Sequence, residues 1–258
     1  MTLVSVLAAF EKPSTSDFVW TPFFRVFGFP VNWIVVMAAT TVSVVVGLFY
    51  FALRKGKTVP GRLQFLAEAS VQFIRQTVVM EVIGPDGLVF MPLLVSLFIF
   101  IFFANIFEVM PGNTTINSRV AFPLVMGVMI WVIYNAVGIR KHGFFGYLKV
   151  QCVPSGAPKL MLVLLIPVEF LSNIVVRPFS LALRLFLNMM AGHFLLALVF
   201  GATVITWEAG IILKPFAVLP LAVSVGMLLI EIFVAVLQAF IFVILSATYI
   251  QSAMVSEH

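Results

Sequence analysis

Three side chains that can carry charge stand in long apolar stretches of this sequence: Arg184, His193 and Glu231. A charged group at membrane depth is energetically expensive, and such residues mark ion and proton pathways in membrane proteins. Histidine and glutamate can take up and release a proton near physiological pH, whereas arginine keeps its charge. The residue types therefore indicate proton transfer, with His193 and Glu231 as carriers and Arg184 as a fixed cation.

Helical spacing places Arg184 in a row of polar and small side chains. The row recurs every three or four residues and so shares one helix face: Arg177, Ser180, Arg184, Asn188 and Ala191. On the next apolar stretch, Glu231 and Gln238 are seven residues apart and again share a face. For Arg177, beside Pro178 near a basic helix end, a buried ion pair or a side chain that reaches the headgroups explains the charge equally well.

A turn at residues 206–214 joins these two stretches. In an antiparallel helix pair, residues at one depth have numbers with a constant sum, which pairs Arg184 with Gln238 and His193 with Glu231. We therefore expect His193 and Glu231 at a common depth, either as a proton relay or as an internally satisfied hydrogen-bonded pair. His193 is half a helical turn round from Arg184, so it should point away from whatever Arg184 faces.

Asn105, Glu108 and Glu169 are weaker candidates. Asn105 and Glu108 come at the outer end of an apolar stretch, where they either line an aqueous access path or meet the lipid headgroups. The sequence contains no nucleophile, metal-ligand cluster or pair of carboxylates at helical spacing, so we expect no enzymatic site, metal or cofactor. The single cysteine, Cys152, excludes an internal disulfide, and three histidines are too few for a two-haem cytochrome.

The composition places the chain in a membrane. Of the 258 residues, 62% are hydrophobic and 10% are charged, so a soluble fold could not cover its own surface with polar groups. The net charge of +5 comes from basic residues in short loops between apolar runs. This pattern favours orientation in a bilayer over nucleic-acid binding.

The expected fold class is an all-α polytopic membrane protein that forms a single membrane domain over residues 1–258. Uncharged runs predict upright spanning helices over residues 31–53, 88–107 and 120–139. The stretches 160–205 and 215–250 are too long for upright spans. They predict a pair of long antiparallel helices, strongly tilted to the membrane normal, that carry the polar residues.

Between the first two spans, residues 60–83 predict an amphipathic helix. Its polar stripe is Gln64, Glu68, Gln72, Arg75 and Gln76. A helix that lies in the cytoplasmic interface and a helix that packs on a partner subunit both fit this pattern.

Loop charges predict the orientation. Residues 54–87 carry five Lys/Arg and residues 140–159 carry four, whereas residues 108–119 carry one. The positive-inside rule makes the first two loops cytoplasmic, which puts the amino terminus outside and the carboxyl terminus in the cytoplasm.

The run from Arg177 to His193, RPFSLALRLFLNMMAGH, closely resembles the signature of subunit a of F-type ATP synthases. LQAFIF at residues 237–242 resembles the family's second signature, and weaker similarity runs through residues 105–111 and 138–148. The amino-acid sequence is most similar to bacterial, and in particular actinobacterial, members of this family. The chain departs from the usual pattern at Leu187, where Gly or Ala is common, and Glu169 stands one residue out of register with some members.

The resemblance implies a non-catalytic proton-channel subunit of the bacterial plasma membrane that couples the proton-motive force to ATP synthesis. Arg184 would face the proton-carrying carboxylate of the rotating subunit c ring, and His193 and Glu231 would line the half-channel open to the outer compartment. Asn188 and Gln238 would also belong to the proton path, and further lining residues would be Ser180, Arg177, Glu108, Asn105 and Glu169. The implied partners are the subunit c ring, the peripheral-stalk subunit b, the rest of the ATP synthase and membrane lipid, without nucleic acid.

The competing hypothesis is a secondary transporter with a substrate site at the bilayer midplane. It predicts inverted internal repeats and broken helices in both halves of the chain. Here the polar residues cluster in the second half and no repeat is visible.

Overall fold

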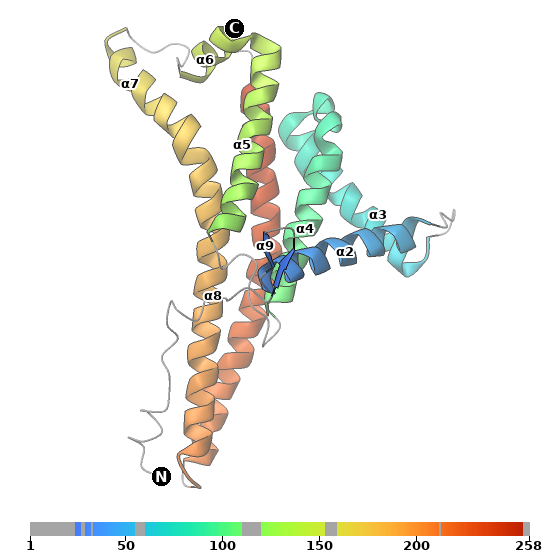
Figure 1. Ribbon diagram of the computed structural model, residues 1–258, viewed down its shortest axis with the longest axis vertical. Helices are drawn as coiled ribbons and strands as arrows, with labels where there is room; N and C mark the ends of the chain where they lie inside the picture. Colours follow the sequence, from blue (N-terminus) through green and yellow to red (C-terminus); the bar gives the residue numbers. More distant parts are fainter. Residues whose placement is uncertain are drawn as a thin grey trace. The chain divides into compact units, whose positions relative to one another are not determined.

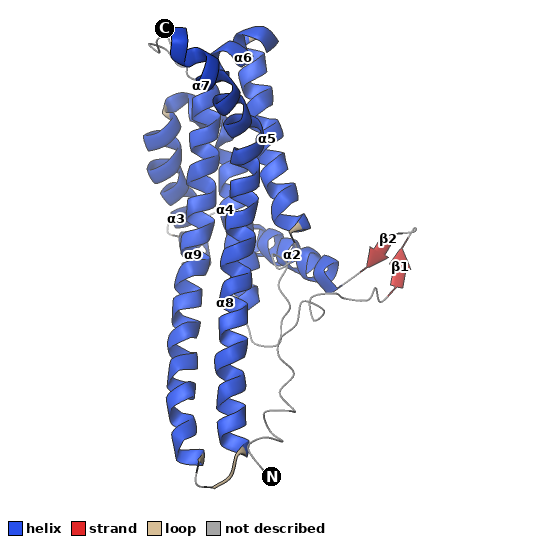
Figure 2. Ribbon diagram, turned by 90° about the vertical axis from the view of Figure 1, so that its left-hand side faces the viewer, coloured by secondary structure: helices blue, strands red, loops and turns tan. Residues whose placement is uncertain are grey.

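The computed structural model describes residues 24–26, 29–31, 33–54, 60–109, 120–152, 159–211 and 213–254. Helices make up nearly all of this part of the chain (Figures 1 and 2). Among the described residues, five helices are long and apolar enough to cross a membrane: Val35–Leu53, Pro85–Phe107, Ala121–His142, Met161–Glu208 and Lys214–Met254. The protein is therefore an all-α polytopic membrane protein, as predicted.

A short hairpin precedes the first long helix, and the sequence pattern had not predicted it. Strands β1 (Phe24–Val26) and β2 (Phe29–Val31) pair antiparallel, with Arg25 opposite Pro30. Helix α2 then runs over Trp33–Leu53, so the expected start of this span at residue 31 falls in a strand. Val31 is paired with Phe24 in this hairpin, so the helix begins only after the strand has ended.

The chain divides into two compact units. Unit 1 comprises Met1–Thr41, Phe102–Arg119 and Phe186–Gln238, and unit 2 comprises Val42–Ile101, Val120–Leu185 and Ala239–His258. Helices α2, α4, α8 and α9 each contribute residues to both units.

Unit 2 contains the segment for which an amphipathic helix was predicted. Helix α3 (Arg62–Ile74) continues as a π-helix, η2 (Arg75–Ile83), and then as a 3₁₀ helix, η3 (Pro85–Phe90), before α4 (Met91–Val109). Gly84, with φ of 90°, permits the turn that ends η2. Apolar side chains on α3 remain exposed, namely Leu63, Phe65, Leu66 and Phe73. A membrane interface and a partner subunit both fit such a surface.

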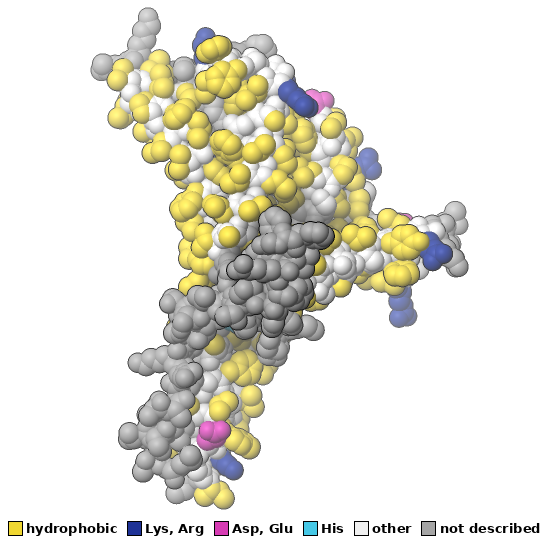
Figure 3. All heavy atoms as spheres, viewed as in Figure 1, with side chains coloured by type: hydrophobic (Ala, Val, Ile, Leu, Met, Phe, Trp, Pro, Cys, Tyr) yellow, Lys and Arg dark blue, Asp and Glu magenta, His cyan; other side chains and the backbone are white. Residues whose placement is uncertain are grey.

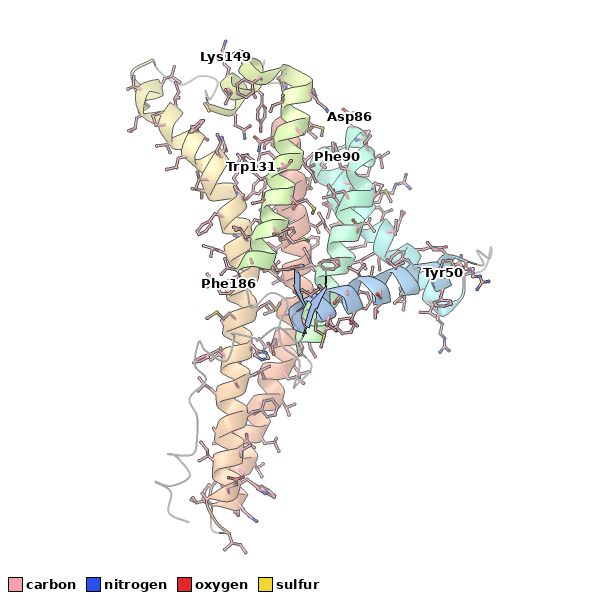
Figure 4. All side chains as sticks on the ribbon, in the orientation of Figure 1. Tyr50, Asp86, Phe90, Trp131, Lys149 and Phe186 are labelled. Carbon is pink, nitrogen blue, oxygen red and sulfur yellow. The ribbon has the colours of Figure 1, made fainter. Side chains whose placement is uncertain are left out.

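Two further helices of unit 2 are joined tightly by Gly143. Helix α5 (Ala121–His142) is followed by α6 (Phe144–Cys152), which carries Lys149, while Trp131 lies in the middle of α5 (Figure 4). The Tyr147 ring occupies the space where a side chain at Gly138 would stand, and its hydroxyl donates to Asn135 Oδ1 at 3.1 Å. Burial raises the pKa of Tyr147 to about 12, so this donor keeps its proton at physiological pH.

The last part of the chain forms the two longest helices. Helix α7 (Lys159–Leu171), the π-helical turn η4 (Ser172–Val176) and α8 (Arg177–Glu208) follow one another without a loop. After a turn at Gly210, η5 (Lys214–Ala217) leads into α9 (Val218–Met254). The candidate spans are 48 and 41 residues long. At about 1.5 Å per residue, both exceed a hydrocarbon core of about 30 Å.

Apolar side chains cover most of the visible face of α5 and α7 (Figure 3). Several on α7 are more than half exposed, including Val163 at 76% and Leu164 at 75%. Contiguous exposed apolar surface of this kind suits contact with lipid or with other subunits.

Candidate functional site

Unit 1 is built on the packing of the second half of α8 against the first half of α9, which run side by side in opposite directions (Figures 1 and 2). The inward face of α9 carries polar groups among small ones. Ser224, Glu231, Ala235 and Gln238 are buried at helical spacing, and the Ser224 hydroxyl donates back to the Pro220 carbonyl at 2.8 Å. The predicted shared face of Glu231 and Gln238 is thus turned toward the interior of the protein.

Glu231 is buried without a hydrogen-bond partner. It is 5% exposed, and neither carboxyl oxygen has a partner among the described residues. A buried polar group in this condition is costly, so its retention points to function rather than to stability. Its two oxygens remain available to a donor from outside this part of the chain.

Gly192 makes room for the Glu231 carboxyl. A Cβ added at Gly192 would stand 2.9 Å from Glu231 Oε1, closer than real Cβ atoms approach other atoms. Helix α8 therefore approaches this carboxyl closely at a residue that has no side chain. Sequence reasoning missed Gly192, although its position directly before His193 was a usable signal.

His193 follows Gly192 on α8 and is half-buried, and its Nδ1 is buried without a partner among the described residues. Since both oxygens of Glu231 are also unbonded, the internally satisfied His193–Glu231 pair is not formed. His193 instead directly follows Gly192, whose backbone lies against the Glu231 carboxyl. The imidazole and the carboxyl each retain hydrogen-bonding capacity for a third group.

Gln238 bonds to Asn188 across the two helices. Asn188 Nδ2 donates to Gln238 Oε1 at 2.6 Å, and Gln238 is 1% exposed with no partner for its Nε2 in the described part of the chain. The depth rule had paired Gln238 with Arg184, one helical turn earlier on α8.

Residues 102–109, at the end of α4, also belong to unit 1. Asn105 is fully buried and donates its Nδ2 to the Ala235 carbonyl at 3.2 Å, between Glu231 and Gln238 on α9. Val109, Met189 and Ala235 form a small apolar core beside it, with Ile106 and Leu228 packed on it. Asn105 therefore ties α4 to the polar stretch of α9. Glu108 lies in the last turn of α4, and its side chain is outside the described part of the structure.

Arg184 and Arg177 lie in unit 2 and differ in their surroundings. Arg177 is half-buried, donates to Ser252 Oγ at 3.1 Å and lies over the Tyr249 ring at 5.2 Å. These contacts to α9 account for its charge as a local cation–π and hydrogen-bonded site. Arg184 is exposed and has no hydrogen-bond or ion-pair partner among the residues described.

The predicted polar row on α8 points outward from the chain. Ser180, Arg184, Asn188 and Ala191 are all exposed, and Leu187 between them is 53% exposed. Ser180 only donates to the carbonyl of Arg177, at 3.1 Å. The row is thus presented to whatever lies beside α8.

Glu169 belongs to a different group of contacts in unit 2. Its Oε2 lies 3.4 Å from the side-chain nitrogen of Asn173, which also donates to the Gln151 carbonyl at 2.7 Å. No group of three or more His, Cys, Asp or Glu side chains that could hold a metal ion occurs within the described ranges.

Comparison with known proteins gives one consistent result. The family described as "ATP synthase A chain" matches residues 34–251. The chain is 44% identical to "ATP synthase subunit a" of Nocardioides sp. (strain ATCC BAA-499 / JS614) over 219 residues, 84% of this chain and 79% of that one. It is 34% identical to the protein of that name from Rhodococcus erythropolis over 263 residues, 99% of this chain and 95% of that one.

Proposed function

Since this chain belongs to the family of ATP synthase A chains, we propose that it conducts protons through two offset half-channels where it meets the rotating subunit c ring. Family membership places it in the proton-translocating membrane sector of an F-type ATP synthase, and its relatives are bacterial. It is therefore a multi-pass bacterial membrane protein that takes part in ATP synthesis. Its role there is to carry protons, and ATP chemistry takes place on other subunits.

The exposed, unpartnered Arg184 is the observation that supports this proposal most. A permanent cation in an apolar stretch needs a counter-charge, and the described part of this chain supplies none. Its outward position suits pairing with a carboxylate on another subunit. The exposed Asn188 and Ser180 on the same helix face would border that contact.

The chemistry follows from the fixed charge. A guanidinium beside a passing rotor carboxylate lowers the pKa of that carboxylate and favours release of its proton. Because Arg184 cannot give up its own charge, it also blocks direct proton flow between the two half-channels. Protons must then travel with the ring, driven by about 2.3 kcal/mol per charge for each 100 mV.

Unit 1 suits the half-channel that opens to the outer compartment. The buried carboxyl of Glu231 and the imidazole of His193 keep unbonded polar atoms beside the contact at Gly192. Gln238 keeps an unbonded Nε2, and its Oε1 is linked to Asn188 on the exposed face of α8. This set forms a series of polar groups from the interior of unit 1 to that face.

Orientation and partners complete the proposal. The loop charges support an amino terminus outside and a carboxyl terminus in the cytoplasm. The exposed apolar face of α3 and the exposed face of α8 would contact the peripheral-stalk subunit b and the subunit c ring, respectively.

The proposal is tested by reconstituting the membrane sector in vesicles with and without this chain. Acid pulses should drive proton uptake through the sector only when the chain is present, and the purified chain alone should not hydrolyse ATP. Equal proton flux in vesicles that lack the chain, with the other subunits assembled, would refute the proposal.

Replacing Gly192 with alanine should slow proton-driven ATP synthesis. The new methyl group would meet Glu231 Oε1 at 2.9 Å and push the carboxyl out of its place. We expect a loss of about three- to tenfold, since a carboxyl of this kind still has rotamers to adopt. ATP synthesis in inverted vesicles measures the effect.

Gly226→Ala is the matched control, because nothing lies within 4 Å of a Cβ at that glycine on α9. Shortening the carboxyl in Gly192→Ala/Glu231→Asp should restore part of the rate. A Gly192→Ala complex that works at the rate of Gly226→Ala would show that the close approach has no bearing on transport.

A further inference from the structure

A break in the helical hydrogen-bond ladder lies shortly before Arg184. Residues Ser172–Val176 form a π-helical turn, in which the N–H of Arg177 bonds the carbonyl of Ser172, five residues back. A regular α-helix would use the carbonyl of Asn173 instead. A π turn holds one extra residue and so rotates everything after it by about 100° relative to an unbroken α-helix.

Pro178 explains why the break falls here. Proline has no N–H, and in a regular helix its ring clashes with the carbonyl four residues back, here that of Ile174. Pro178 also cannot donate to the Asn173 carbonyl, which is five residues back. With the Arg177 N–H bonded to Ser172, the Asn173 carbonyl has no donor at α- or π-spacing within its own helix.

Tyr134 on α5 supplies the missing donor. Its hydroxyl donates to the Asn173 carbonyl at 2.7 Å, and the side chain is 1% exposed. Water is scarce at this depth, so a backbone carbonyl without a donor in its own helix must find a partner elsewhere in the protein. The Asn173 side chain also donates to the Gln151 carbonyl of α6, which ties the π turn to a second helix.

Helix α5 also touches α8 just before Arg184. A Cβ at Gly127 would lie 2.7 Å from the Pro178 carbonyl and 3.4 Å from Ala182 Cβ, so the two backbones are in close contact there. Gly127 and Tyr134 are seven residues apart and share one face of α5. Within unit 2, α5 therefore holds the segment from Asn173 to Ala182 at two points.

We propose that the Tyr134 hydroxyl is a positioning group for Arg184. By bonding the carbonyl that the π turn leaves free, it keeps the extra residue in place, fixes the rotation of α8 and so sets the direction of the Arg184 guanidinium. The role of Arg184 in this proposal rests on the proposed function, whereas the way in which Tyr134 sets its orientation does not. Tyr134 acts through backbone geometry and does not contact the proton.

The first test is Tyr134→Phe in the whole complex, with Tyr249→Phe as its control. Tyr134→Phe keeps the ring that packs at 5.9 Å from Tyr249 and removes only the hydroxyl. We expect ATP synthesis to fall about fivefold, because the loss of one hydrogen bond should reduce the fraction of complexes with a correctly oriented Arg184 by about this factor. Proton leak per assembled complex should rise. Tyr249→Phe should match the wild type in both assays.

The second test reads the rotation directly. Spin labels at Val132→Cys on α5 and Phe179→Cys on α8, both at exposed positions, report the distance across unit 2 in a Cys152→Ala background. Deleting Ile174 should remove the extra residue, shift this distance and abolish synthesis. Inserting one alanine after Val176 in the deletion variant should restore both.

The outcomes separate this proposal from its alternatives. A merely destabilising change would reduce the amount of complex without raising leak per complex, and an added alanine would not reverse it. Wild-type label distances and synthesis in Tyr134→Phe, or failure of the inserted alanine to restore the deletion variant, would overturn the proposal. If the label distance shifts while ATP synthesis stays normal, the Arg184→Ala complex distinguishes two explanations. An Arg184→Ala complex without ATP synthesis refutes the positioning role of Tyr134, and an active one refutes the proposed function.

Discussion

ATP synthesis should vanish when Arg184 is replaced by alanine, while passive proton leak through the assembled complex stays or rises. In the proposed mechanism, the change removes the charge that favours deprotonation of the rotor carboxylate and also the barrier between the half-channels. We expect synthesis to fall by about two orders of magnitude or more, as when a preorganised charge is removed from a reaction site. The measurements are ATP synthesis and acid-induced fluorescence quenching in inverted vesicles.

Arg184→Lys should be severely impaired as well. Lysine keeps a charge but lacks the planar guanidinium, and its ammonium group can lose a proton in a desolvated site, which arginine cannot do. Arg177→Ala is the control for a nearby arginine, and it should have the milder effect. Arg177 is already bonded to Ser252 and Tyr249 within the chain, so it is not the charge left for a partner. Robust synthesis by Arg184→Ala at normal assembly would overturn the mechanism.

Replacing either His193 or Glu231 with alanine should slow ATP synthesis by about a hundredfold or more, the usual contribution of a positioned proton-transfer group. Both side chains keep unbonded polar atoms beside the same contact of α8 with α9, and each replacement would remove one proton carrier from that place. The rate of synthesis at a fixed pH difference measures the loss. Since the Arg184 barrier remains, leak should not rise in these variants, unlike in Arg184→Ala.

The exchanged pair, with His193→Glu and Glu231→His together, should recover part of the lost rate because it restores both titratable groups at the same contact. Glu208→Ala is the matched control, since Glu208 is an exposed carboxylate at the far end of α8. If both single replacements synthesise ATP at the rate of Glu208→Ala, the relay assignment is wrong.

The helical elements could be predicted because their signals are local. Long uncharged runs and the turn at Gly210 depend on composition and backbone preference within the run itself. The polar row of Ser180, Arg184 and Asn188 followed from helical spacing alone, and the structure places all three at exposed positions.

Other features depend on partners far away in the chain. The contact of Gly192 with Glu231 depends on how two helices pack together. It therefore cannot be predicted from the spacing of residues within α8 alone. The hydrogen bond between Asn188 and Gln238 also joins two helices, so spacing within either helix could not predict it. The π turn had a readable cause in Pro178, but its stabilisation by Tyr134 required the position of α5.

Arg184 also bears on how the protein is made. A cation without a counter-charge among the described residues adds about 3 kcal/mol to the insertion of that helix into a bilayer, before any partner is present. The residue that we propose the assembled complex needs therefore also makes membrane insertion of the unassembled chain less favourable. In the proposed complex, a carboxylate on a neighbouring subunit would offset this penalty, so folding of the chain and its assembly would be thermodynamically linked. The order in which the subunits meet in the membrane thus becomes part of the folding pathway of this protein.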